Sequence, residues 1–230
     1  MIKNYILSIQ QINDQRFWKP ILWSGILTLI TFLVILIAGW SFAGWFFDHL
    51  LSYFDFIKEG SWLKTAFRFI LSIFAFLIGF FFFGSIQSAY LGIFIDQVID
   101  GIQAKHYPEI QLRPPPTLSK SVIIAIKLIV LSFVINILAS PLFLLGWFFP
   151  PLGITIQVLV NGYLIGKEYM TTVEERLPVN FNKVKKSYTR YGASGSALWM
   201  IPVVNLFAPI LVCASIFHAM AKECISVPKV

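Results

Sequence analysis

The sequence predicts an all-α integral membrane protein with two long transmembrane helices and two partly inserted helical hairpins. Of its 230 residues, 57% are hydrophobic, 17% are aromatic and only 13% are charged, about half the charged share of a soluble domain. Four blocks of 27 to 39 residues contain no Lys, Arg, Asp or Glu, whereas a membrane-spanning helix needs about 20 apolar residues. We therefore expect a single membrane domain over residues 1–230.

The first element is an amphipathic segment over residues 1–19, where apolar side chains recur every three or four residues. This spacing predicts a helix that lies in the membrane interface. Its apolar side chains are Ile2, Tyr5, Ile6, Ile9, Ile12 and Phe17. The charge-free block 20–47 follows, with four tryptophans near its ends. Because indole rings favour the headgroup region, this block predicts the first full span.

A second charge-free block, 69–95, follows the polar segment 48–68 and predicts the second full span. The helix should continue beyond the membrane, because several apolar residues after the block share one helical face. These residues are Phe94, Ile95, Val98 and Ile102. We expect this helix to close at the proline run 114–116, and Thr117 or Ser119 to cap the next helix.

The third block, residues 128–166, is too long for one span and carries prolines at positions 141, 150 and 151. Since proline breaks a helix interior, we expect a hairpin over 119–170. Its arms would be Ser119–Leu138 and Ile154–Tyr169. The connecting segment 140–153 is apolar and aromatic, so it is expected at membrane depth or at the far interface.

The most polar segment, 167–190, is expected in water, and the last charge-free block follows it. Pro202, Asn205 and Pro209 interrupt this block in the phrase IPVVNLFAPIL. A second hairpin over 192–222 therefore fits better than one straight helix. Asn205 would lie in its turn, where the side-chain amide can bond backbone groups freed by the prolines.

The distribution of charge predicts the orientation. Segment 48–68 has three basic and three acidic residues, whereas basic residues exceed acidic ones in 1–19, 96–127, 167–190 and 222–230. Because 48–68 is the only segment without a net positive charge, we expect it outside and both termini in the cytoplasm. The positive-inside rule counts Lys and Arg alone, so its own support for this orientation is modest. The net charge of +7 is dispersed between apolar blocks, so we expect the lipid bilayer as a partner and no nucleic acid.

No catalytic motif is visible, and His49, His106 and His218 are widely separated. We therefore expect no enzyme, no cofactor and no metal site. Cys213 and Cys224 lack the spacing of a metal site and are expected to be free thiols. His218 lies inside an apolar block, and helix packing is a more common role there than a proton relay.

Two features are candidates for binding an anion. The start of a half-helix near Gly153 or near 192–195 would present free N–H groups, although close helix packing is the more common use of such glycines. The membrane-proximal basic residues could bind a tetrahedral oxyanion or contact anionic lipid. They are Arg16, Lys19, Lys167, Arg176, Lys183, Lys185, Lys186 and Arg190. Asn161 and Glu168 are expected to pair with each other or with a neighbouring helix, and lining a pore is the alternative.

Four phrases of the sequence resemble one known family. They are DQRFWKPILW, FIDQVIDGIQAKHYPE, NGYLIGKEY, which Asn161 and Gly162 open, and IPVVNLFAPIL. In this order they resemble the CysZ-like family of bacterial inner-membrane sulfate permeases, which is also named after an etoposide-induced eukaryotic relative. The likeness covers nearly the whole chain. It implies two long transmembrane helices, two partly inserted hairpins, an oligomer, and sulfate uptake for cysteine synthesis.

The chain departs from this family before the first span. Sulfate-permease members have a glycine, a leucine and paired arginines there, whereas this chain has Arg16, Phe17, Trp18 and Lys19. Only Lys19 falls on an arginine position, and Arg16 replaces the glycine. The resemblance implies a divergent permease for a small oxyanion, with sulfate as the expected substrate. We expect the anion to meet Arg16, Phe17, Lys19 and Arg190 at the cytoplasmic entrance. The alternative function is a membrane scaffold or biogenesis factor that does not transport.

Overall fold

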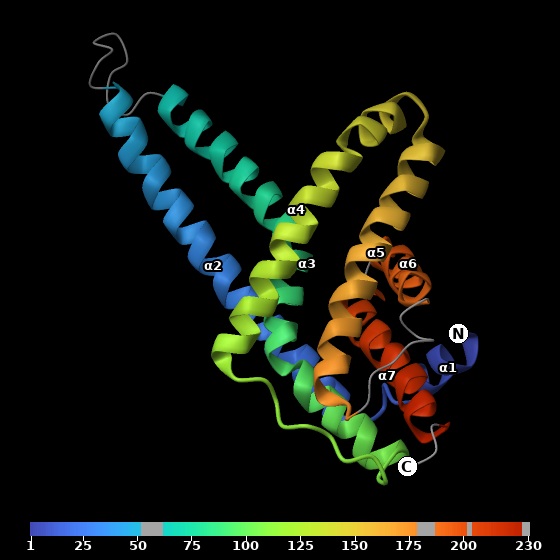
Figure 1. Ribbon diagram of the computed structural model, residues 1–230. Helices are drawn as coiled ribbons and strands as arrows, with labels where there is room; N and C mark the ends of the chain where they lie inside the picture. The colour runs from blue at the N-terminus through green and yellow to red at the C-terminus, as the bar shows by residue number, and fades with distance from the viewer. Residues whose placement is uncertain (52–61, 179–186, 202–203, 227–230) are drawn as a thin grey trace. The chain divides into compact units, whose positions relative to one another are not determined.

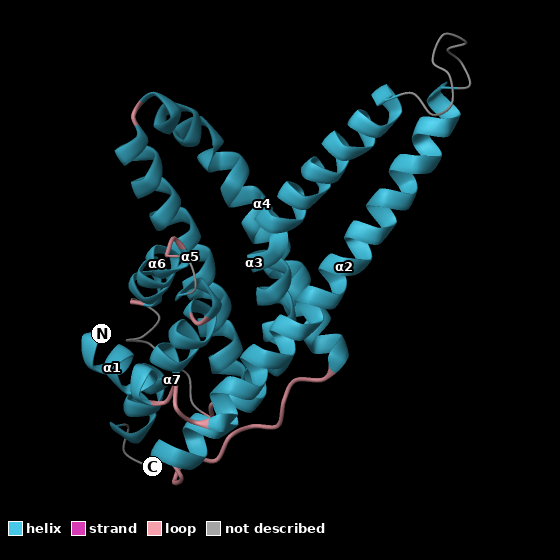
Figure 2. Ribbon diagram, turned by 180° about the vertical axis from the view of Figure 1, so that it is seen from behind, coloured by secondary structure: helices cyan, strands magenta, loops and turns pink. Residues whose placement is uncertain are grey.

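A computed structural model describes residues 1–51, 62–178, 187–201 and 204–226 (Figure 1). All regular structure in these residues is helical (Figure 2). The elements are α1 (Ile2–Gln10), α2 (Gln15–Leu51), α3 (Trp62–His106), α4 (Leu118–Phe148), α5 (Pro150–Arg176), α6 (Tyr188–Trp199), the 3-10 turn η2 (Val204–Leu206) and α7 (Ala208–Ser226). The predicted all-α class is confirmed.

Three helices of the described residues are long and apolar enough to cross a membrane. The segments are Gln15–Phe42 of α2, Leu118–Gly146 of α4 and Ala208–Ile225 of α7. The first coincides with the first predicted span. The other two belong to the predicted hairpins, so the number of candidate spans differs from the prediction. The second predicted span, 69–95, lies within α3, where many side chains fall outside the described set.

The chain divides into two compact units. Leu22–Ile93 forms one unit, and Met1–Ile21 with Phe94–Val230 forms the other. In the first unit α2 pairs with α3: the hydroxyls of Thr31 and Tyr90 lie 2.7 Å apart, and the rings of Phe32 and Phe76 meet edge to face at 5.9 Å. Such hydroxyl and aromatic contacts hold helices together where the surroundings are apolar.

In the second unit, α7 is the central helix and packs against α1, α5 and α6. Its candidate span is 72% buried, whereas that of α4 is only 6% buried. A helix that is apolar on all sides and enclosed by protein forms a core. The long apolar helix α4 instead presents its side chains outward, as expected for contact with lipid. Of these two apolar helices, α7 forms the core of its unit and α4 lies on its surface.

The central hairpin forms, but its predicted arms are too short. Helix α4 continues through Pro141 to Phe148, and α5 begins at Pro150, so the predicted apex 140–153 is wrong and only Phe149 separates the helices. Pro141 removes the donor for the carbonyl four residues earlier, and the Ser140 hydroxyl donates to that Ile137 oxygen at 2.7 Å instead. Prolines at the first two positions of α5 cost nothing, because those N–H groups have no helical partner.

The arms are therefore about 46 Å and 40 Å long at 1.5 Å per residue, more than the roughly 30 Å of a bilayer core. At the apex, Gly146 and Gly153 bring the two backbones together, since a Cβ on Gly146 would lie 2.5 Å from the Gly153 Cα. In Figure 1, α4 runs up to the apex and α5 runs back down from it, so the two helices form one hairpin. The length of each arm permits it to cross the bilayer.

Two other predicted boundaries shift. The segment 1–19 is not one helix, because α1 ends at Gln10 and the Asp14 carboxylate starts α2 by accepting a hydrogen bond from the Arg16 N–H at 3.0 Å. Helix α3 ends at His106, well before the proline run. Pro108 is the physical reason, since the residue before a proline avoids the helical conformation. Thr117 is the N-cap residue of α4, although its side chain makes no capping bond.

The last block folds into two helices around η2. Asn205 lies in this turn, and its backbone N–H donates to the Ile201 carbonyl at 3.0 Å. Pro209 occupies the first turn of α7, where proline is tolerated, and Pro202 falls outside the described residues. Helix α6 packs along α5 at a very small separation, because a Cβ on Gly192 would overlap the carbonyl oxygen of Gly162. The glycines of this region therefore serve helix packing.

Candidate functional site

The predicted anion site begins at the first turn of α2. Arg16 and Lys19 are exposed there, one turn apart, whereas the Phe17 side chain is only 2% exposed and belongs to the core. The methylene groups of Arg16 lie against α3, where a methyl group added to Gly101 would approach them to 3.1 Å. Phe17 therefore anchors the turn, and the two flanking cations face outward.

The electrostatic field at this turn is positive. Asp14 pairs with Lys105 of α3 at 3.5 Å, and hydrogen bonding from the Arg16 backbone holds the pKa of the Asp14 carboxyl below its usual value. This carboxylate interacts with Arg16 and Lys105, and Lys19 follows one turn after Arg16. An anion would meet an excess of positive charge next to a candidate membrane span.

Arg190 lies elsewhere, at the start of α6. Its neighbour Tyr191 is held by α1: Asn4 donates its side-chain N–H to the Tyr191 hydroxyl at 3.0 Å, and the Tyr5 hydroxyl donates to the Tyr191 carbonyl at 2.8 Å. Among the described residues, no hydrogen bond or ion pair joins Arg190 to Arg16 or Lys19. Arg190 and the pair Arg16 and Lys19 therefore lie on different helices, α6 and α2, and their grouping around one anion stays a prediction.

A buried polar ladder between α1 and α7 was not predicted. Asn4, Ser8 and Gln11 are at most 7% exposed, and they share one face of α1 and the turn after it. Ser8 meets the Ser215 hydroxyl at 3.0 Å, and Gln11 meets the Nε2 atom of His218 at 3.2 Å. The sequence carried a signal for this ladder, because its polar residues recur every three or four positions, as the isoleucines of α1 do.

His218 is the centre of this ladder. Its Nδ1 atom lies 2.9 Å from the Tyr107 hydroxyl, so both ring nitrogens have partners, and the His106 ring packs edge to face against it at 5.4 Å. Two buried atoms nearby, Gln11 Oε1 and His106 Nε2, have no partner within the described residues. Burial lowers the pKa of His106. The arrangement agrees with the packing role predicted for His218.

Arg176, one of the predicted oxyanion-binding cations, instead holds three segments together. It is 3% exposed, and its terminal nitrogens lie 2.5 Å from Asp96 and from Asp100 of α3. Its Nε–H donates to the Arg113 carbonyl at 2.9 Å, and the Arg113 N–H donates back to the Arg176 carbonyl at 2.7 Å. Since each of its three side-chain nitrogens donates to a partner, Arg176 is structural.

The remaining predicted residues have other surroundings. Lys167 lies 5.9 Å from the centre of the Tyr188 ring, which is within cation–π range. Asn161 is partly buried and Glu168 is exposed, and no hydrogen bond joins them in the described residues. Cys213 and Cys224 form no disulfide bond, as predicted. Lys183, Lys185 and Lys186 fall outside the described residues. No group of three His, Cys, Asp or Glu side chains in the described ranges could hold a metal ion.

A family profile described as sulfate transporter CysZ/etoposide-induced protein 2.4 matches residues 5–209. The chain belongs to this family. The match runs from α1 into the first turn of α7, and it includes the basic turn of α2, the Arg176 cluster and the phrase around Asn205. No curated protein and no solved structure matches the chain. The family resemblance predicted from four sequence phrases is thereby confirmed.

Proposed function

We propose that this member of the sulfate transporter CysZ family is a permease for a small oxyanion, with sulfate as the substrate. The observation that carries the proposal is the exposed pair Arg16 and Lys19 at the entry to the first candidate span. Guanidinium and ammonium groups bind tetrahedral oxyanions by charge-assisted hydrogen bonds. The adjacent Lys105 increases the positive field, which raises the local anion concentration.

In this proposal the anion first meets Arg16 and Lys19, while Phe17 keeps the turn in place from the core. Arg190, which the sequence predicts at the same entrance, is not part of this proposal, because it lies on α6 whereas the pair lies on the first turn of α2. The buried rings around His218 are also outside the path, since both nitrogens of that ring already have partners.

The same proposal includes a location and an assembly. The chain is placed in a bacterial inner membrane as a multi-pass protein, with both termini in the cytoplasm and a pore formed by more than one subunit. Thiol labelling tests the orientation in a background without Cys213 and Cys224. Cysteines introduced at Lys58 and at Lys185 should react from opposite sides of the membrane. Labelling of both from one side contradicts this orientation.

Uptake of radiolabelled sulfate into proteoliposomes tests the function. We expect uptake above that of protein-free liposomes, and a lower rate with Arg16→Gln and Lys19→Gln together. A matched control is Lys120→Gln, which removes an exposed cation that pairs with Glu175 on a different part of the unit. The control should transport as the wild type does.

A scaffold or biogenesis role is the second candidate. It is favoured by the replacement of the family glycine by Arg16 and by the presence of only one of the paired basic residues, at Lys19. Uptake equal to that of protein-free liposomes for sulfate, sulfite, thiosulfate and selenite would support the scaffold over the permease.

A further inference from the structure

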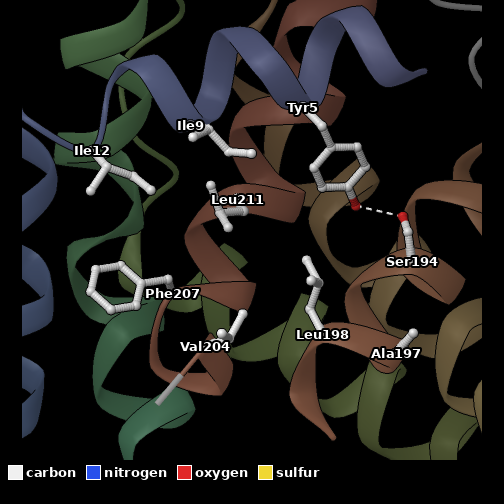
Figure 3. Close-up of a pocket in the computed structure, with 9 residues that line it drawn as sticks. All are labelled: Tyr5, Ile9, Ile12, Ser194, Ala197, Leu198, Val204, Phe207 and Leu211. Carbon is white, nitrogen blue, oxygen red and sulfur yellow. Dashed lines mark hydrogen bonds between the residues drawn. The ribbon is translucent and has the colours of Figure 1, made fainter. Parts of the chain in front are cut away.

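A cavity of about 610 Å³ lies between α1, α6, η2 and α7 (Figure 3). Its walls are formed by aliphatic and aromatic side chains, among them Ile9, Ile12, Leu198, Phe207 and Leu211. Figure 3 shows these side chains converging on one space from the two ends of the chain. The volume is within the range of cavities that hold small organic ligands, and every lining residue belongs to the same compact unit.

The polar atoms of the wall are already satisfied. The hydroxyls of Tyr5 and Ser194 lie 2.6 Å apart. Each is within donating distance of the Tyr191 carbonyl oxygen, at 2.8 Å. Burial raises the pKa of Tyr5 to about 12, so its hydroxyl stays neutral. An anion or a sugar would find no free partner in this wall, whereas an aliphatic chain would lose nothing on entering.

The cavity continues into the outer surface of α1. The polar face of α1 is used by the ladder to α7, so its isoleucines point outward: Ile2, Ile6 and Ile9 are 74%, 49% and 53% exposed. Ile9 belongs both to this outer row and to the cavity wall. The cavity and the exposed row therefore form one apolar surface. In a membrane protein such a surface is suited to acyl chains.

A basic residue lies one helical turn before this surface on α6. Arg190 is exposed on the first turn of α6, and its carbonyl accepts a hydrogen bond from the cavity residue Ser194 at 3.1 Å. In the described part of the chain its guanidinium has no ion-pair partner. Residues four apart on a helix share a face, so Arg190 and Ser194 lie on the same side of α6. An arginine near an apolar cavity complements a phospholipid, which carries an anionic phosphate and acyl chains on one glycerol.

We propose that this cavity binds one acyl chain of an anionic membrane phospholipid, with the phosphate at Arg190. The site is separate from the proposed anion entrance at Arg16 and Lys19. It fits lipid better than a second protein helix, because the apolar wall adjoins the exposed isoleucines of α1 and an exposed arginine lies one helical turn before it on α6. The bound lipid would fix α1 and the α6–α7 pair at a defined depth in the leaflet.

Photolabelling tests the proposal. The full chain is purified in detergent with less than one equivalent of phosphatidylglycerol that carries a diazirine in its acyl chain, irradiated, and mapped by mass spectrometry. We expect adducts at cavity residues such as Leu198 and Leu211, and few at the exposed α4 residue Phe133. The lipid is dilute, so non-specific lipid contact at α4 is suppressed. Equal labelling of cavity and α4 overturns the proposal.

A variant that fills the cavity tests whether the lipid chain binds there. Ala197→Trp fills the cavity and should lower its labelling about tenfold or more, since losing the burial of about two methylene groups already has that effect. Val130→Trp on the exposed face of α4 is the matched control and should leave cavity labelling unchanged. Leu198→Trp is used if the first variant is not monodisperse. Unchanged cavity labelling in a monodisperse filled variant overturns the proposal.

The headgroup is tested by exchanging lipid and residue. With a zwitterionic phosphatidylcholine probe, or with Arg190→Gln, cavity labelling should fall. Equal labelling by the two lipids in the wild type rejects the role of Arg190 and hence the anionic-lipid proposal. Cavity labelling that appears only after oligomers are dissociated identifies a second copy as the occupant and also overturns it. Neither result depends on whether the protein transports sulfate.

Discussion

Replacing Arg176 by Gln should be the most destabilising single change outside the apolar core. Arg176 is 3% exposed, and its guanidinium makes two charge-assisted bonds, to Asp96 and Asp100, and one bond to the Arg113 carbonyl. Gln cannot replace these three donors, and it leaves two carboxylates on neighbouring turns of α3 without their shared cation. The loss therefore separates α5 from both α3 and the segment that leads into α4.

The magnitude follows from how exposed each member is. Removing one partner of a fully buried ion pair costs about 3–5 kcal/mol. The side chains of Asp96 and Asp100 are 32% and 56% exposed, so water recovers part of their solvation, and we expect about 2–4 kcal/mol. For a chain of this size that corresponds to a decrease in Tm of roughly 5–15 °C.

Thermal unfolding in detergent measures this effect, with Glu175→Gln as the matched control. Glu175 is the preceding residue and pairs with Lys120 in an ion pair whose side chains are 26% and 55% exposed. Such an exposed pair contributes about 0–1 kcal/mol, so its loss should change Tm little. Adding Asp96→Asn and Asp100→Asn to the Arg176 variant should recover part of the stability, since the uncompensated charges are gone. An Arg176→Gln variant no less stable than Glu175→Gln would refute the structural role.

Three further outcomes are expected. Lys19→Gln, and likewise Arg16→Gln, should weaken sulfate binding by about 1–3 kcal/mol, the range for hydrogen bonds to charged groups; calorimetric affinity unchanged in the double variant would remove both from the site. Gly192→Val should separate α6 from α5 and lower Tm, whereas Gly25→Ala, whose added methyl meets no atom within 4 Å, should not; equal Tm values would contradict the close packing. Asp14→Ala should cost about 1 kcal/mol through the lost cap, measured by chemical denaturation. The folded-state pKa of Asp14 is lowered, so its contribution to the free energy of unfolding is present above about pH 4 and is lost as the pH falls through the lowered pKa. The stability difference between wild type and Asp14→Ala should therefore shrink on acidification, and a difference that grows would contradict this reasoning.

The helices could be predicted from the sequence because their cause is local. Long charge-free blocks of apolar residues leave the backbone no partner except itself, so helices follow wherever the block is long enough. Helix ends were harder, since they depend on single contacts. Proline usually ends a helix, but the Ser140 hydroxyl bonds the carbonyl that Pro141 leaves without a donor, and that compensation cannot be recognised from the proline alone. The end of α3 was predicted at the proline run 114–116, but the single Pro108 is enough to end the helix at His106.

The candidate site was only partly predictable, for a different reason. The sequence identifies which cations lie near apolar blocks, but not which of them find partners across the fold. Arg176 and Arg190 have similar sequence surroundings, each following a polar stretch. In the structure one is enclosed by Asp96 and Asp100 from a segment 76 to 80 residues away, and the other is exposed. Long-range pairing therefore decides whether a cation is structural or able to meet a ligand.

The orientation of α1 follows from the solvent around it. In a soluble protein an amphipathic helix buries its isoleucines, because water is the poorer environment for them. In a lipid environment isoleucine gains little by burial, whereas an unpaired amide or hydroxyl costs free energy, so the polar face turns inward. This accounts for Asn4, Ser8 and Gln11 against α7. The same preference explains why the exposed isoleucines Ile2, Ile6 and Ile9 lie on the face of α1 opposite the ladder, where they adjoin the proposed lipid site.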